Sequence, residues 1–83
     1  MVTYFVVQAF QKGSRGALIA DEPREAQSER HALRLADRLS PAVEGLIVFS
    51  RTGDPATGEW DDATIIQTIG EVPDEVLEAA AVA

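Results

Sequence analysis

Four carboxylates and the only tryptophan lie within one stretch, Ser50 to Asp62, which also holds two glycines and a proline. The acids are Asp54, Glu59, Asp61 and Asp62. Carboxylate oxygens are ligands that calcium and magnesium prefer, but this spacing does not fit the D-x-[DN]-x-[DN]-G calcium loop. Glycine and proline are typical of a turn, so we predict a turn and no metal site. Because the stretch is longer than most hairpins need, its acids and Trp60 could also form a partner-binding tip.

A second candidate site is a row of three arginines spaced by four residues. They are Arg30, Arg34 and Arg38. On a helix this spacing places them on one side, where like charges repel one another slightly. Such a row could bind a phosphate, a nucleic-acid backbone or an acidic protein surface. The other interpretation is a solvated helix face that Glu29 and Asp37 partly neutralise.

The remaining reactive side chains predict no catalytic residue and no cofactor. His31 is the only histidine, and no nearby residue supplies the orienting partner or nucleophile that imidazole catalysis needs. The chain has no cysteine, which excludes disulfides, thiol catalysis and thiolate metal sites. The segment "GSRG" is a tight turn rather than a phosphate-binding glycine loop.

The net charge of -7 is unevenly distributed along the chain. Residues 1–43 hold six bases and five acids, whereas residues 44–83 hold one base and nine acids. Nucleic-acid binding normally needs a basic face, so we expect no nucleic-acid partner. The apolar start "MVTYFVVQAF" has no basic flank and is shorter than the ~20 residues of a membrane span, which predicts a cytoplasmic protein without membrane contact. Abundant alanine and a preference for arginine over lysine favour a bacterial genome of high G+C content.

Hydrophobic periodicity predicts a single α+β domain over residues 1–83. We expect strands at residues 3–11, 17–20, 45–51 and 64–72, because these stretches are rich in apolar, β-branched and aromatic residues and lie between turn-forming clusters. The stretch Asp21 to Pro23 should end the second strand or place it at an edge, since proline cannot donate to a ladder. The expected fold is a four-stranded, mostly antiparallel sheet in the order β-β-α-β-β-α.

Two helices complete the predicted fold. The main helix runs to Leu39, with Ser28 as its N-cap, and packs on one sheet face through residues spaced i, i+3, i+4 and i+7. These are Ala32, Leu35, Ala36 and Leu39. A short C-terminal helix from Glu75 to about Ala81, capped by Asp74, offers mostly alanine, with a few larger apolar residues. These are Val76, Leu77 and Val82.

Both faces of the predicted strands are apolar, and this feature says more about how the protein assembles than the order of the strands does. The first strand carries Tyr4, Val6 and Phe10 on one face and Phe5, Val7 and Ala9 on the other. The third strand carries Leu46 and Val48 against Ile47 and Phe49, and the fourth Ile66 and Val72 against Ile65 and Ile69. Such strands are normally covered on both sides, and the C-terminal helix is thin cover. Burial against a second copy is an economical solution, so we predict a homodimer.

These observations favour a small non-catalytic interaction or accessory domain, acting as a homodimer and open to a further protein partner. An alternative is a regulatory or ligand-binding module in which the arginine row receives an anionic group. A third class, an enzyme with a site formed across the dimer, would need a concave pocket. That pocket would have to hold His31 or several of the acids between Asp54 and Asp62.

Overall fold

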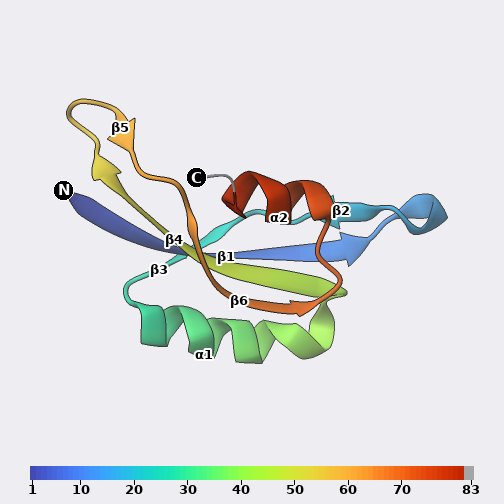
Figure 1. Ribbon diagram of the computed structural model, residues 1–83. Coiled ribbons are helices and arrows are strands. Elements are labelled where there is room, and N and C mark those ends of the chain that lie inside the picture. The colour runs from blue at the N-terminus through green and yellow to red at the C-terminus, as the bar shows by residue number, and fades with distance from the viewer. Residues whose placement is uncertain (82–83) are drawn as a thin grey trace.

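The computed structural model describes the backbone of residues 1–81 and the side chains of residues 1–78. The chain forms an α+β fold with an antiparallel sheet, one main helix and one short helix, as predicted (Figure 1). The strands are β1 (Val2–Lys12), β2 (Leu18–Ala20), β3 (Arg24–Ala26), β4 (Gly45–Asp54), β5 (Glu59–Trp60) and β6 (Thr64–Gly70). The helices are α1 (Glu29–Leu39) and α2 (Asp74–Ala81), with 3-10 turns at Ser14–Gly16 and Ser40–Ala42.

The sheet has six strands, so the prediction of four is wrong. The six strands nevertheless occupy four positions, because two edge strands are each broken in two. β2 and β3 pair with successive segments of the same side of β1, and β5 and β6 do so with β4. The break between β2 and β3 spans residues 21–23, which lie opposite only Gln8 and Ala9 of β1. Proline has no N–H for the ladder, and it is tolerated at such an edge irregularity.

The first sheet face packs against α1, which lies below the sheet in Figure 1. The apolar side of α1 is the predicted one: Ala32 and Ala36 are fully buried, and Leu35 and Leu39 pack against the same core. From the sheet, this core receives Val7 and Ala9 of β1, Ala26 of β3, and Leu46 and Val48 of β4. Small alanines on the helix let it approach the branched side chains of the sheet closely.

The start of α1 is fixed by two local hydrogen bonds. Ser28 is the N-cap, as predicted, and its Oγ accepts from the backbone N–H of His31 at 3.1 Å. The ring of His31 turns back, and its Nδ1 accepts from the backbone N–H of Gln27 at 3.1 Å. This pair resembles a capping box in which histidine takes the place of glutamate. The geometry gives His31 a structural task at the helix entry.

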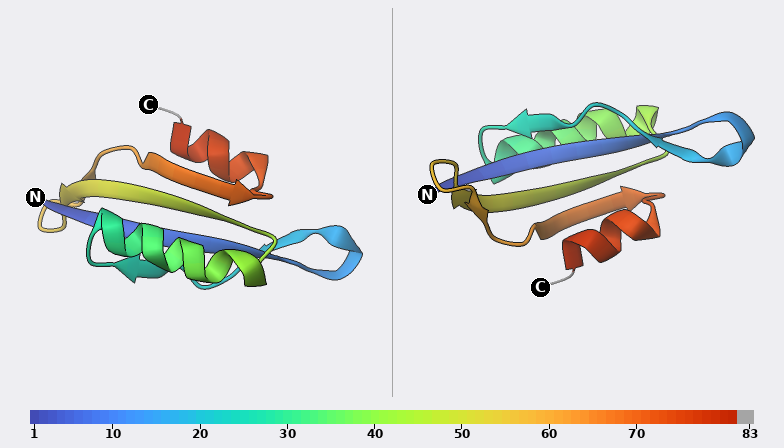
Figure 2. Two further views of the ribbon diagram at one scale, coloured as in Figure 1. Left: turned by 90° about the horizontal axis from the view of Figure 1, so that it is seen from below. Right: turned by 90° about the horizontal axis from the view of Figure 1, so that it is seen from above.

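The second sheet face is only partly covered by α2. In the right-hand view of Figure 2, α2 lies along β6 at one side of the sheet, and no helix lies in front of β1 and β4. Ile47 on this face is fully buried, but Tyr4, Val6 and Phe49 remain half-buried. The helix begins one residue earlier than predicted, because the carbonyl of Pro73 accepts from Val76 and Leu77. The predicted contribution of Val82 lies outside the described residues.

A bulge in β6 changes the predicted distribution of its side chains. Strict alternation placed Ile66 and Ile69 on opposite faces, yet both pack against the core under α1. The pairing with β4 slips by one residue between Val48 and Phe49, which inserts an extra residue and re-aims the strand. Ile65 pairs with Phe49 and therefore belongs to the second face.

Among the described residues, no helix is long and apolar enough to span a membrane.

Candidate interaction surface

The uncovered part of the second face forms an open groove of about 570 Å³. We call it the open groove; it is lined by Tyr4, Val6, Gln8, Pro23, Glu25, Phe49, Arg51 and Trp60. Its floor is β1, with β3 on one side and β4 on the other. Four of the lining side chains are aromatic or aliphatic and half-buried, so the groove is a mainly apolar surface with charged groups on its two sides.

Trp60 forms one end of the open groove. Its ring centroid lies 5.5 Å from that of Tyr4, within the range of favourable aromatic pairs. Trp60 pairs with Gly53 across β4 and β5, and the indole covers the space that a side chain would take. A Cβ added at Gly53 would come to 2.5 Å from Cδ2 of the indole. The tryptophan is therefore anchored on the sheet.

The charged groups of the open groove lie on opposite sides of β1. Glu25 of β3 pairs with Val6, and Arg51 of β4 pairs with Tyr4. Both side chains are exposed. Nε of Arg51 donates to the carbonyl oxygen of Asp61 at 3.3 Å, which ties the arginine to the segment after β5. That bond uses one of five guanidinium donors, so most of the hydrogen-bonding capacity of Arg51 lies in its Nη groups.

Gln8 holds the side of the open groove where the edge strand is broken. Its amide donates to the carbonyl oxygen of Ala9 at 3.1 Å and to that of Asp21. The backbone N–H of Asp21 in turn donates to the carbonyl of Ala9 at 2.9 Å. These bonds position the irregular segment at Pro23, and Pro23 also lines the open groove.

The stretch from Ser50 to Asp62 is a hairpin whose strands continue almost to its tip. Asp54 pairs with Glu59, and the carbonyl of Asp54 accepts from the N–H groups of Thr57 and Gly58 at 3.2 and 2.8 Å. Oδ1 of Asp54 also accepts from the N–H of Ala56 at 2.9 Å. Gly58 adopts φ +75°, which glycine permits without strain. The carboxylate of Asp54 thus shapes the turn.

The other acids of this hairpin do not gather at one point. Glu59, Asp61 and Asp62 are exposed, and Asp62 lines an adjoining cavity of about 340 Å³ beside α2. This cavity shares Phe49 and Arg51 with the open groove. Within the described part of the chain, no three residues of the types His, Cys, Asp or Glu are grouped so as to hold a metal ion. Of the five residues predicted as a binding tip, only Trp60 lines the open groove.

The predicted arginine row lies on the outer side of α1, away from the sheet. Arg30, Arg34 and Arg38 are all exposed, and none of them lines any of the three cavities described here. His31 also lies outside these cavities, with its Nδ1 engaged at the helix entry.

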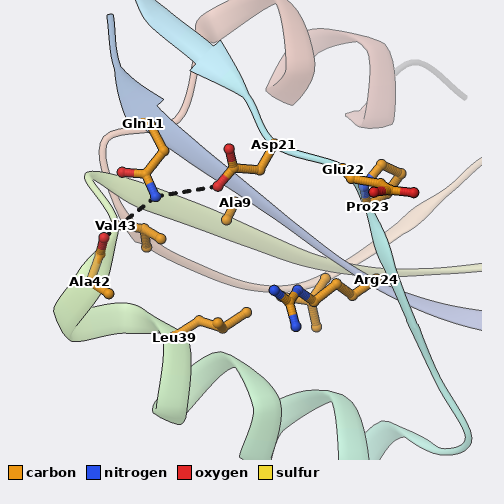
Figure 3. A pocket seen from close by; sticks show the side chains of 10 residues that line it. Ala9, Gln11, Asp21, Glu22, Pro23, Arg24, Leu39, Ala42 and Val43 are labelled. Atoms are coloured by element: carbon orange, nitrogen blue, oxygen red, sulfur yellow. Dashed lines mark hydrogen bonds between the residues drawn. The ribbon is translucent and has the colours of Figure 1, made fainter.

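Another arginine lines a cavity of about 580 Å³ between the C-terminal end of α1 and the broken edge strand (Figure 3). The Arg24 guanidinium points toward Leu39, over a floor that includes Ala9 and Val43. On the far side, the amide of Gln11 donates to Asp21 Oδ2 at 3.3 Å and to the Ala42 carbonyl at 3.4 Å. The cavity is lined by one cation, Arg24, and by two carboxylates, Asp21 and Glu22, around an apolar floor.

Sequence reasoning missed three polar residues of the open groove: Gln8, Glu25 and Arg51. A signal was present for two of them. Gln8 interrupts the apolar run of β1 at a position that alternation assigns to the second face, and Arg51 follows Phe49 on that face of β4. Glu25 carried no such signal, because β3 is three residues long and has no periodicity of its own.

Compared with protein-family models, curated proteins and solved structures, the chain matches none, so any functional conclusion rests on this geometry.

Proposed function

We propose that the protein is a small non-catalytic interaction domain that acts as a homodimer, with a second copy packed on the open groove. The carrying observation is that α2 covers β6 and leaves Tyr4, Val6 and Phe49 half-buried over β1 and β4. Apolar surface removed from water contributes about 25 cal/mol per Å². An aromatic and aliphatic surface with polar sides is the usual composition of a protein interface.

The groove also has the aromatic content that such interfaces concentrate. Tyrosine and tryptophan are enriched among residues that dominate binding energy, and Tyr4 and Trp60 lie in contact at one end of the groove. Their polar atoms can find partners at an interface while their rings are buried. The pair and its neighbour Phe49 would supply aromatic anchors of the dimer contact.

The oligomeric state tests this proposal directly. At micromolar concentration, sedimentation equilibrium should give twice the chain mass of 8.9 kDa. Val6→Glu should give a monomer, since an unpaired charge buried at an interface costs about 3–5 kcal/mol. Circular dichroism checks whether the variant is folded. If Val6→Glu does not fold, Val6→Lys is the second variant to test. The fold tolerates lysine better, because its alkyl stem can lie on the sheet while the ammonium reaches water.

The matched control is Ile19→Glu. Ile19 is 55% exposed on the edge strand β2 and does not line the open groove. It introduces the same charge, and the dimer should persist. A wild-type chain that is monomeric at micromolar concentration overturns the proposal, and so does a folded Val6→Glu protein that dimerises as well as Ile19→Glu.

A second candidate is a regulatory module that binds an anionic group. Arg24 is its candidate residue because Arg24 lines a cavity and the arginine row lines none of the three, although Asp21 and Glu22 line the same cavity. Isothermal titration with inorganic phosphate, polyphosphate and nucleotides tests it. This candidate predicts that Arg24→Gln abolishes binding and that combined replacement of Arg30, Arg34 and Arg38 by serine preserves it. Loss of binding in the serine variant alone would assign the anion to the row instead. A wild-type protein that binds none of these anions removes the candidate.

A further inference from the structure

The two charged side chains of the open groove have a placement that a second copy can complement. Glu25 stands beside Val6 on one side of β1, and Arg51 stands beside Tyr4 on the other. Neighbouring strands are about 4.8 Å apart, so the strands that carry these two residues are about 10 Å apart. Along the strand direction the two residues are offset by two positions, or about 7 Å.

A twofold dimer through the open groove can have its axis in one of two principal directions. An axis across the strands would place β3 over β3 and β4 over β4, so that Glu25 faces Glu25 and Arg51 faces Arg51. An axis parallel to β1 exchanges the two sides and places β3 of one copy over β4 of the other. Only this second arrangement is self-complementary in charge, which an isologous interface requires.

We infer that two copies pack through the open groove about a twofold axis parallel to β1, so that Glu25 of each copy pairs with Arg51 of the other. This inference rests on the proposed homodimer and specifies its orientation. Two equivalent ion pairs would then flank a central apolar contact made by β1 of both copies. The offset of about 7 Å along the strands is one that the long arginine side chain can span.

The pairing of sheets in this orientation agrees with general sheet packing. Stacked sheets lie about 10 Å apart with their strands within about 30° of each other, and the side chains of the two inner faces interdigitate. An axis parallel to β1 keeps the strands of the two copies aligned. Tyr4 and Val6 of one copy then face the same residues of the other.

Charge reversal and mixing test the inference. Glu25→Arg alone and Arg51→Glu alone each create two like-charged pairs, so each should raise the dimer dissociation constant at least tenfold at low salt. The double variant restores opposite charges and should dimerise like the wild type. Mixing the two single variants should also restore association, because their heterodimer has two attractive pairs. Damage to the fold cannot produce such a gain on mixing.

Matched controls change the same charges on the other side of the molecule. Glu29→Arg and Arg38→Glu lie on α1 and should change the dissociation constant by less than twofold. Sedimentation equilibrium gives the constants, and all effects of Glu25 and Arg51 should shrink as salt rises. If neither the double variant nor the mixture recovers while Val6→Glu still abolishes the dimer, the orientation is wrong and the homodimer stands. A monomeric wild type overturns both.

Discussion

Replacement of Leu46 by alanine is expected to lower the free energy of unfolding by about 2–5 kcal/mol. Leu46 is fully buried near the start of β4, where its side chain belongs to the principal core under α1. Its truncation removes apolar contacts and leaves a cavity that the fixed sheet cannot close. A domain of 83 residues has a total stability of about 4–12 kcal/mol, so this single change removes a large part of it.

Urea unfolding followed by circular dichroism at a fixed chain concentration measures the effect of Leu46→Ala. Fixed concentration is required because dimer formation would add to the apparent stability. Ile19→Ala is the matched control: this aliphatic side chain is 55% exposed, and its loss should change the stability by less than about 0.5 kcal/mol. A Leu46→Ala protein within 1 kcal/mol of the wild type would contradict the packing described here.

Replacement of Gly53 by alanine is expected to displace Trp60 from the sheet and to shift its fluorescence emission to longer wavelength. The added Cβ would overlap the indole, which lies against the backbone of Gly53 at the end of the open groove. The cost in unfolding free energy should be about 1–3 kcal/mol, as for other overpacked sites. Trp60 is the only tryptophan, so intrinsic emission reports on this contact alone.

Gly16→Ala separates the loss of the Trp60 contact from a general loss of stability. Gly16 has φ +78° and no atom within 4 Å of an added Cβ, so the substitution costs only the left-handed strain of about 1–2 kcal/mol. Its emission spectrum should match that of the wild type. An unshifted spectrum for folded Gly53→Ala would mean that the indole does not rest on Gly53.

The local elements followed from short-range chemistry. Ser28 and the spacing from Ala32 to Leu39 specified a helix with one buried side, because capping and the 3.6-residue period act within a few residues. The apolar character of both faces of β1 and β4 could also be predicted, because successive side chains of a strand point to opposite faces and both sets are apolar. The turn at Gly58 was predicted from residue types for the same reason.

Features that depend on pairing between segments far apart in the chain could not be predicted from the sequence. β4 continues beyond Arg51 to Asp54 because β1, which pairs with it from Val2 onward, offers a ladder that local propensity does not reveal. β3 exists because Arg24 to Ala26 finds the free side of β1. The bulge that turns Ile66 toward the core arises from a slip in pairing with β4.

The sequence by itself determined the two helices and the segments that contain β1, β2, β4 and β6, and that both sheet faces would be apolar. Tertiary structure alone decided that α2 docks along β6, and so left Tyr4, Val6 and Phe49 uncovered between Glu25 and Arg51. The physical reason is that periodicity records which side of an element is apolar. The position at which a short helix docks depends instead on contacts between residues far apart in the chain.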